Sequence, residues 1–131
     1  MPTDYRAAFE EFARFAEQGD TGAQFNLGVM YGLGLGVAQD YLMVMDWYEK
    51  AALNGNAQAQ CNLAWMYGTG RGVPQDFVRA LAWYSVSAAS GQDTARRNRD
   101  ILNDRMTPNQ IEQAQNMARE LGATVRTARE N

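Results

Sequence analysis

Apolar residues recur along this chain at spacings of three and four residues, and polar residues fill the positions between them. Such spacing places the apolar side chains on one face of a helix. Alternation of apolar and polar residues, which is typical of a half-buried strand, does not occur in any segment. We therefore predict a predominantly helical chain with no sheet and with seven helices, or six if the last two merge. The clearest stripes are Ala23, Leu27, Met30 and Tyr31, and then Ala59, Leu63, Met66 and Tyr67.

The same pattern returns after 36 residues. Residues 20–55 and 56–91 carry the same amino acid at 16 positions in register. A period between about 20 and 50 residues indicates a solenoid, in which each unit buries its apolar face against its neighbours. The predicted fold class is therefore an all-α superhelical solenoid of antiparallel helix pairs. The repeated residues to which we assign a structural role are Trp47 and Trp83, Tyr48 and Tyr84, Gly32 and Gly68, Gly36 and Gly72, and Gly55 and Gly91.

Each unit is predicted to contain a helix A, a glycine-rich loop and an antiparallel helix B. Asp40 and Asp76 stand where helix B needs an N-cap, and Gly55 and Gly91 can end it because glycine tolerates the left-handed conformation. The register extends beyond these two units, so we expect one domain over residues 1–131. Its parts are an N-terminal half repeat at 4–19, repeats at 20–55 and 56–91, capping helices at 92–121, and a tail at 122–131 that we expect to fray.

The last helix has a strong start signal in the segment Thr107-Pro108-Asn109-Gln110. Thr107 can cap the helix, proline suits the first turn, and Gln110 can close a capping box. The helix that follows has a narrow apolar stripe and a polar outer face. We expect it to act as a lid on the stack of repeats.

The composition argues against catalysis and metal binding. Histidine is absent, which removes the commonest general base and the commonest metal ligand. The single cysteine, Cys61, can form neither an intramolecular disulfide nor a thiolate cluster for zinc. Carboxylates are scattered over caps and surface positions, so a hydrolase with paired carboxylates is disfavoured. We expect no catalytic residue, no metal site and no cofactor.

Charge and hydropathy limit the partners. The net charge of −3 argues against nucleic acid as a partner. The longest uncharged apolar stretch, residues 27–38, has 12 residues and four glycines, short of the ~20 that a membrane-spanning helix needs. We therefore expect no membrane insertion and a soluble chain. With no leader visible after Met1 we expect a cytoplasmic location, or a periplasmic or secreted one if a signal was removed before Met1.

Two features of the repeats invite a ligand-binding interpretation. The glycine strings at 32–36 and 68–72 could be taken for phosphate loops, but each follows a helix and the spacing of the dinucleotide motif is wrong. The three tryptophans could be taken for an aromatic cage. Since Trp47 and Trp83 fall at the same slot of successive units, packing between units is the favoured interpretation.

The residues that recur also carry a resemblance to a known family. The string A-Q-x-N-L-x-x-M-Y-G-x-G-x-G-V-x-Q-D, followed by W-Y, A-A and G, resembles the Sel-one-like repeat, a relative of the tetratricopeptide repeat. The resemblance covers residue 4 to about residue 91, and the closing M-T-P-N-Q-I segment is similar to the C-terminal caps of bacterial members. It implies a right-handed superhelix that acts as a protein-interaction scaffold, often in bacterial signalling, envelope or host-contact systems.

One polar pattern suggests where a partner would bind. Asn26, Asn62 and Asn98 fall at the same slot of three successive A helices, beside the apolar stripe. In tetratricopeptide relatives the A helices line the concave face, so these amides could hold the backbone of an extended peptide. They could instead bridge neighbouring helices or face water. The arginines that flank the last asparagine, Arg96, Arg97 and Arg99, would favour an acidic residue or a free carboxyl terminus of the peptide.

The function that follows is a non-catalytic adaptor, monomeric by itself, that binds a peptide or protein segment on the concave face. The alternative from another class is a structural element that joins copies of itself through the solenoid ends or through its phenylalanine-rich first helix. A dilution series separates the two, because self-assembly depends on concentration.

Overall fold

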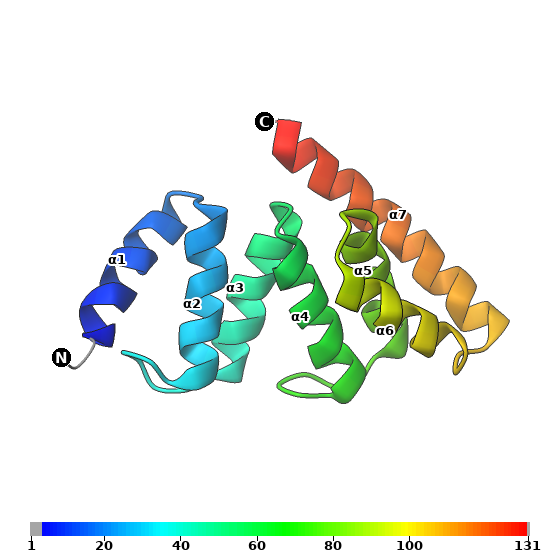
Figure 1. The fold of residues 1–131 in the computed structure, drawn as a ribbon, viewed down its shortest axis with the longest axis horizontal. Coiled ribbons are helices and arrows are strands. Elements are labelled where there is room, and N and C mark those ends of the chain that lie inside the picture. The colour runs from blue at the N-terminus through cyan, green and yellow to red at the C-terminus, as the bar shows by residue number, and fades with distance from the viewer. Residues whose placement is uncertain (1–3, 131) are drawn as a thin grey trace.

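The chain folds into a row of helices, and no strand is present in the part of the chain that the structure describes (Figure 1). This structure is a computed structural model that describes residues 4–130. The prediction of seven helices is confirmed for these residues. They are α1 (Tyr5–Glu17), α2 (Thr21–Leu33), α3 (Tyr41–Leu53), α4 (Ala57–Thr69), α5 (Phe77–Ala89), α6 (Asp93–Asn103) and α7 (Pro108–Glu130).

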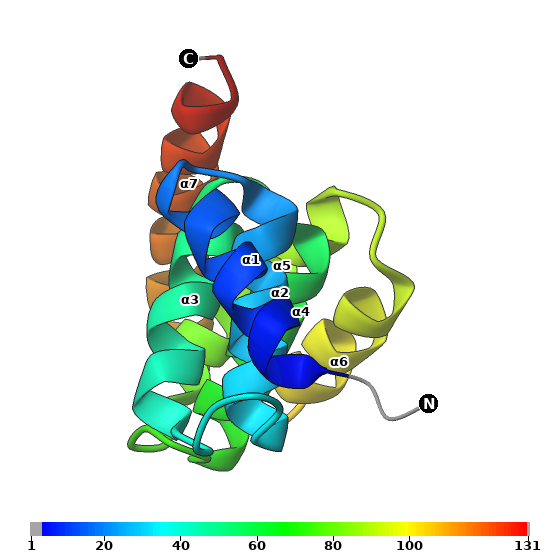
Figure 2. The same ribbon diagram turned by 90° about the vertical axis from the view of Figure 1, so that its left-hand side faces the viewer.

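The helices form the two layers of a solenoid. The A helices are α2, α4 and α6, and the B helices are α1, α3 and α5. Each B helix packs against the A helix before it, where there is one, and against the A helix after it. Figure 2 looks along the row. It shows α7 on the same side as α3 and α5, whereas α6 lies on the opposite side. The antiparallel helix pairs predicted from the period are therefore confirmed.

Aspartate begins every B helix. The carboxylates of Asp4, Asp40 and Asp76 each accept a hydrogen bond from a backbone N–H in the first turn that follows. These N–H groups have no partner within the helix, so the cap satisfies them and opposes the helix dipole with a negative charge. The N-caps predicted at Asp40 and Asp76 are confirmed.

Two glycines let neighbouring units approach each other closely. Gly36 and Gly72 have φ angles of 73° and 79°, a region that other residues rarely adopt. A Cβ atom on Gly36 would collide with the backbone of Tyr5, and one on Gly72 would lie 2.9 Å from the Cβ of Tyr41. The glycine-rich loop of each unit thus rests against the start of helix B in the unit before it.

Two glutamines also tie successive units together from inside the core. Gln24 and Gln60 are only 5% and 0% exposed. The side-chain amide of Gln24 donates a hydrogen bond to the carbonyl oxygen of Ala16 at 3.3 Å, and that of Gln60 donates to Ala52 at 2.9 Å. In both cases the carbonyl belongs to helix B of the preceding unit. A repeated polar residue in the core therefore fixes the register between units.

The cores of the two full units differ by an exchange of bulk. In the first unit Phe25 stacks on Tyr48 with ring centroids 5.5 Å apart, and a Cβ atom on Gly28 would collide with the Tyr48 ring. In the second unit the corresponding residues are Cys61 and Ala64, both buried. The large residue of the first unit is thus matched by a glycine, and the small residue of the second unit by an alanine. The methyl group of Ala64 replaces part of the volume that the missing phenyl ring would otherwise leave.

The C-terminal helix departs from the expected tail. Thr107 and Gln110 form the predicted capping box, with the Thr107 N–H donating to Gln110 Oε1 and the Gln110 N–H donating to Thr107 Oγ1. The expectation that residues 122–131 fray is wrong for the described part, because α7 continues to Glu130; Asn131 lies outside the described residues. Val125 is only 7% exposed and joins the main core, which accounts for the continued helix. As a lid, α7 packs along α5 and reaches α3, where Arg129 contacts Gly55.

Candidate functional site

A recess lies between α2, α3 and α4, with a volume of about 480 Å³. Its floor is apolar and well packed, since Val44, Tyr48 and Met66 are only 3%, 8% and 4% exposed. Its rim is apolar but open to solvent, with Leu33 67% exposed and Trp65 44% exposed. A large indole that remains nearly half exposed contributes little to the core and can contact a partner.

An arginine stands between two aromatic rings at one side of this recess. The guanidinium carbon of Arg71 lies 5.4 Å from the centroid of the Tyr41 ring and 5.6 Å from that of Trp65. Arg71 forms no ion pair and no side-chain hydrogen bond with any residue that the structure describes. The recess therefore combines apolar walls with one positive charge whose hydrogen-bond donors are free.

The three asparagines of the A helices have different surroundings. Asn62 lines the recess and accepts a hydrogen bond from Gln58 Nε2 at 2.7 Å, and its amide lowers the pKa of the Tyr48 hydroxyl. Asn98 Nδ2 donates to the Tyr84 hydroxyl at 3.4 Å. Asn98 thus links α6 to α5, and Asn62 on α4 acts on a tyrosine of α3, which favours the interpretation that these amides bridge neighbouring helices. Binding of a peptide by these amides stays a prediction.

The first asparagine cannot repeat this link. Phe12 occupies the slot of the two tyrosines in the N-terminal half repeat, and a phenyl ring offers no hydroxyl. Asn26 is half-buried, and its side chain makes no hydrogen bond with the residues that the structure describes.

The arginines near the C-terminal end of the row are not equivalent either. Arg96 pairs with Asp93 at 3.0 Å and Arg99 pairs with Asp100 at 3.2 Å, whereas Arg97 is exposed without an ion pair to any described residue. None of the three lines the recess. The recess and the arginines are therefore separate features of the same row of helices.

The two repeated tryptophans lie in the packing between helices. Trp83 is 4% exposed and belongs to the main core, and Trp47 is half-buried against the cluster of Ala16, Ala23 and Leu27 from α1 and α2. The tyrosines that follow them in the sequence, Tyr48 and Tyr84, are buried as well.

Sequence reasoning missed Trp65 and Arg71 as site residues, although a signal was present. Both depart from the repeat: Val29 stands at the Trp65 slot of the first unit, and Leu35 stands at the Arg71 slot. Neither side chain is therefore part of the pattern that the two units share. Two such departures in the lining of one recess mark it as a candidate site, and comparison of the units could have revealed them.

Burial controls the protonation of the groups around these helices. It raises the pKa of the Tyr48 hydroxyl above its ordinary value, and the nearby Asn62 amide offsets part of this shift. Burial likewise raises the pKa of Tyr84, with Asn98 opposing it, and the pKa of the Cys61 thiol. All three groups therefore stay neutral near pH 7, which suits packing.

The described residues lack two other kinds of feature. No three histidine, cysteine, aspartate or glutamate side chains in residues 4–130 come close enough together to hold a metal ion. Within the same residues, no helix combines the length and the apolar character needed to cross a bilayer.

Comparison with known proteins places the chain in a family. The Sel1 repeat model matches residues 21–56 and 57–92, each one residue later than the division at 20–55 and 56–91. Among curated proteins none matches.

Two solved structures are similar to this one. The first is c5321, a protective antigen present in uropathogenic Escherichia coli strains displaying an SLR fold, with a TM-score of 0.89 and 30% identity over 99% of this chain and 29% of that chain. The second is a Sel1 repeat protein from Oxalobacter formigenes, with a TM-score of 0.76 and 30% identity over 79% of this chain and 43% of that chain. The chain thus spans less than half the length of either. The matched repeats and the similarity along the whole chain show that it belongs to the Sel1 repeat family.

Proposed function

We propose that this protein is a non-catalytic adaptor that binds a peptide or protein segment on the face formed by its A helices. Sel1 repeat solenoids generally serve as scaffolds for protein interactions. The observation that carries the proposal is the recess between α2, α3 and α4, whose apolar rim is exposed although its floor is closely packed. An exposed apolar rim around a formed recess is typical of a site that a partner covers.

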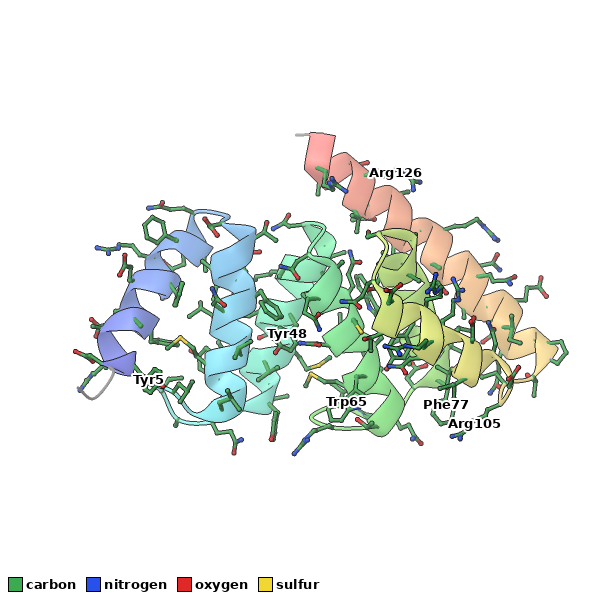
Figure 3. The ribbon with its side chains drawn as sticks, viewed as in Figure 1. Tyr5, Tyr48, Trp65, Phe77, Arg105 and Arg126 are labelled. Atoms are coloured by element: carbon green, nitrogen blue, oxygen red, sulfur yellow. The ribbon has the colours of Figure 1, made fainter. Side chains whose placement is uncertain are left out.

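Apolar residues are also exposed on helices on either side of this recess, which supports an elongated partner. Tyr5 and Phe77, at the slot of Tyr41 in the other units, are 43% and 39% exposed. In the view of Figure 3, Tyr5, Trp65 and Phe77 lie along the lower side of the molecule. Ile101, at the Trp65 slot of α6, is 54% exposed. A segment bound across several units would meet the same kind of contact in each.

The test is capture of partners from a native lysate by the intact chain, followed by titration of the captured segment into variants. Trp65→Val should weaken binding at least tenfold without lowering the melting temperature, because valine already occupies this slot in the first unit. The variant Trp83→Phe, altered in the core, serves as the control. Unchanged affinity for Trp65→Val would overturn the site.

The asparagines are tested separately. If Asn26, Asn62 and Asn98 hold the backbone of the partner, substitution of all three with alanine weakens binding while the fold persists. If they only bridge helices, the melting temperature falls and the affinity of the folded fraction is unchanged.

A second candidate function, end-to-end assembly, is favoured by one observation at α1. Phe15 is 45% exposed, yet the corresponding Ala51 and Ser87 are both 0% exposed. Ser87 faces helix A of its own unit, since its hydroxyl donates to the Ala57 carbonyl at 2.7 Å. The described part of the chain has no such helix beside α1, so its edge can meet another copy. Light scattering across a dilution series tests this, because an adaptor stays monomeric and Phe15→Ala would dissociate an assembly.

A further inference from the structure

We propose that the recess between α2, α3 and α4 is selective for a peptide segment that carries an internal Asp or Glu beside an apolar side chain, with Arg71 binding the carboxylate. This inference rests on the proposed function, because it specifies the partner of the same site. It follows from the unpaired charge of Arg71, from the apolar lining of the recess beside it, and from the exposed apolar residues on the helices before and after the recess.

The positive charge of Arg71 has no partner within the protein. No carboxylate in the described residues lies within 4.0 Å of its guanidinium, as is also true of Arg97, but Arg71 is the arginine that lines the recess. Leucine occupies the same slot in the first unit, so the loop needs no arginine for its own conformation. A charge that the fold neither requires nor neutralises is available to a ligand of opposite charge.

The orientation of Arg71 leaves its donors free for that ligand. Its guanidinium carbon lies 5.4 Å and 5.6 Å from the ring centroids of Tyr41 and Trp65, and these cation–π contacts use none of its N–H donors. Two parallel hydrogen bonds to a carboxylate use those donors. Cation–π contact and carboxylate binding are therefore compatible, and the rings hold the side chain in place before the ligand arrives. This lowers the loss of conformational freedom on binding.

The walls next to Arg71 select an apolar neighbour for the carboxylate. Leu33 and Trp65 form an exposed apolar rim, and Val44 and Met66 close the floor. A side chain that covers this rim also excludes water from the ion pair, which strengthens it. Asn62 lies in the same recess and presents an amide to the backbone of the segment.

The carboxylate is that of a side chain and not of a chain end. Exposed apolar residues occur on the helices on both sides of the recess, with Tyr5 in α1 before it and Phe77 in α5 and Ile101 in α6 after it. In the view of Figure 3, Tyr5, Trp65 and Phe77 lie along the lower side of the molecule. A segment that passes through the recess meets contacts before and after it, whereas a chain end would use only one side.

The experiment selects peptides from a random library of nine-residue segments held inside a carrier protein, so that no free terminus is present. The bait is the full chain as wild type, Arg71→Leu or Trp65→Val, each substituted with the residue of the first unit. Arg126→Leu is the matched control for charge, because Figure 3 places Arg126 on α7, far from Trp65. Melting of each variant confirms that it is folded.

The wild type and Arg126→Leu should enrich segments in which Asp or Glu adjoins an aliphatic or aromatic residue, and Arg71→Leu should lose the acidic preference only. For the most enriched segment, replacement of Glu by Gln, or of Asp by Asn, should weaken binding to the wild type about tenfold and leave binding to Arg71→Leu unchanged.

Three results would overturn the inference. Equal affinity of the wild type for the acidic segment and its amide would show that the carboxylate is irrelevant. A peptide with a free carboxyl terminus could bind more tightly than the same peptide amidated, with no effect of the side-chain carboxylate. That result would show that the recognised carboxylate belongs to a chain end and not to a side chain. Loss of the acidic preference in Arg126→Leu as well would assign it to net charge. Unchanged selection by Trp65→Val, or no enrichment by the wild type, would instead overturn the proposed function.

Discussion

Replacing Ser90 with asparagine should stabilise the protein, because it would complete a hydrogen-bond network that only the first unit possesses. There Gln24 accepts a hydrogen bond on Oε1 from Asn54 Nδ2 at 3.0 Å. In the second unit Gln60 is 0% exposed, and its Oε1 has no hydrogen-bond partner in the part of the chain that the structure describes. Ser90 occupies the slot of Asn54 and is too short to reach it.

The geometry of the two helix ends supports the substitution. Asn54 and Ser90 are the C-caps of α3 and α5, with φ and ψ of −86° and 6° for the first and −88° and 5° for the second. The backbone at Ser90 therefore already has the conformation from which asparagine makes the bond in the first unit. An intramolecular hydrogen bond contributes about 1 kcal/mol net, and relief of a buried unpaired acceptor adds to this gain. We expect Ser90→Asn to raise the free energy of unfolding by about 1 kcal/mol and the melting temperature by roughly 3–5 °C.

The assay is urea unfolding followed by circular dichroism, with thermal melting in parallel. Asn54→Ser should show the opposite change of similar size. In a Gln60→Leu background the gain from Ser90→Asn should vanish, since a double-mutant cycle isolates the pair. A gain that persists in that background, or no gain in the wild type, would refute the reasoning.

Further predictions concern the core. Trp83→Ala should lower the free energy of unfolding by about 3–5 kcal/mol because Trp83 is almost fully buried, measured by urea unfolding; a loss below about 1 kcal/mol would contradict its role in packing. Gly28→Ala should lower the free energy of unfolding by about 1–3 kcal/mol because the new methyl group meets Tyr48. Phe25→Cys should restore most of this stability in the double variant, measured by thermal melting, because it removes the ring that stacks on Tyr48. If the losses of the two single variants simply add, the two positions are not coupled as described. Burial raises the pKa of Tyr48 above its ordinary value of about 10, so the unfolded chain loses this proton first. The contribution of Tyr48 to stability is thus fully present below pH 10 and is lost as the pH rises through the pKa of the folded state, and Tyr48→Phe should flatten the fall in urea-unfolding free energy between pH 9 and pH 11.

The repeat predicted the helices well because each structural unit occurs twice and the same physical constraints act on both copies. Asp40 and Asp76 cap helices as expected, and the capping box of Thr107 and Gln110 forms as expected. Local signals of this kind depend on residues a few positions apart, so a single sequence contains all the information they need.

The path of α7 and the composition of the recess could not be predicted in this way. Neither full repeat has a counterpart of α7, and its continuation to Glu130 depends on contacts of Val125 and Arg129 with distant parts of the chain. The recess joins Trp65 and Arg71 to Leu33 and Tyr41, residues of two different units that only the superhelical arrangement brings together. The favoured assignment of the tryptophans to packing suits Trp83, but Trp65, at a different slot, is 44% exposed.

The position of α7 has a consequence for how many repeats such a protein can contain. Because α7 lies along α5 and reaches α3, it always needs the last two B helices beneath it. Units added or deleted before α3 would leave the contacts of α7 unchanged. A unit placed between α3 and α5 would have to reproduce the glycine turn at Gly55 against which Arg129 packs. Growth and shrinkage of the array over evolution, and its extension by design, are therefore easiest at the N-terminal end.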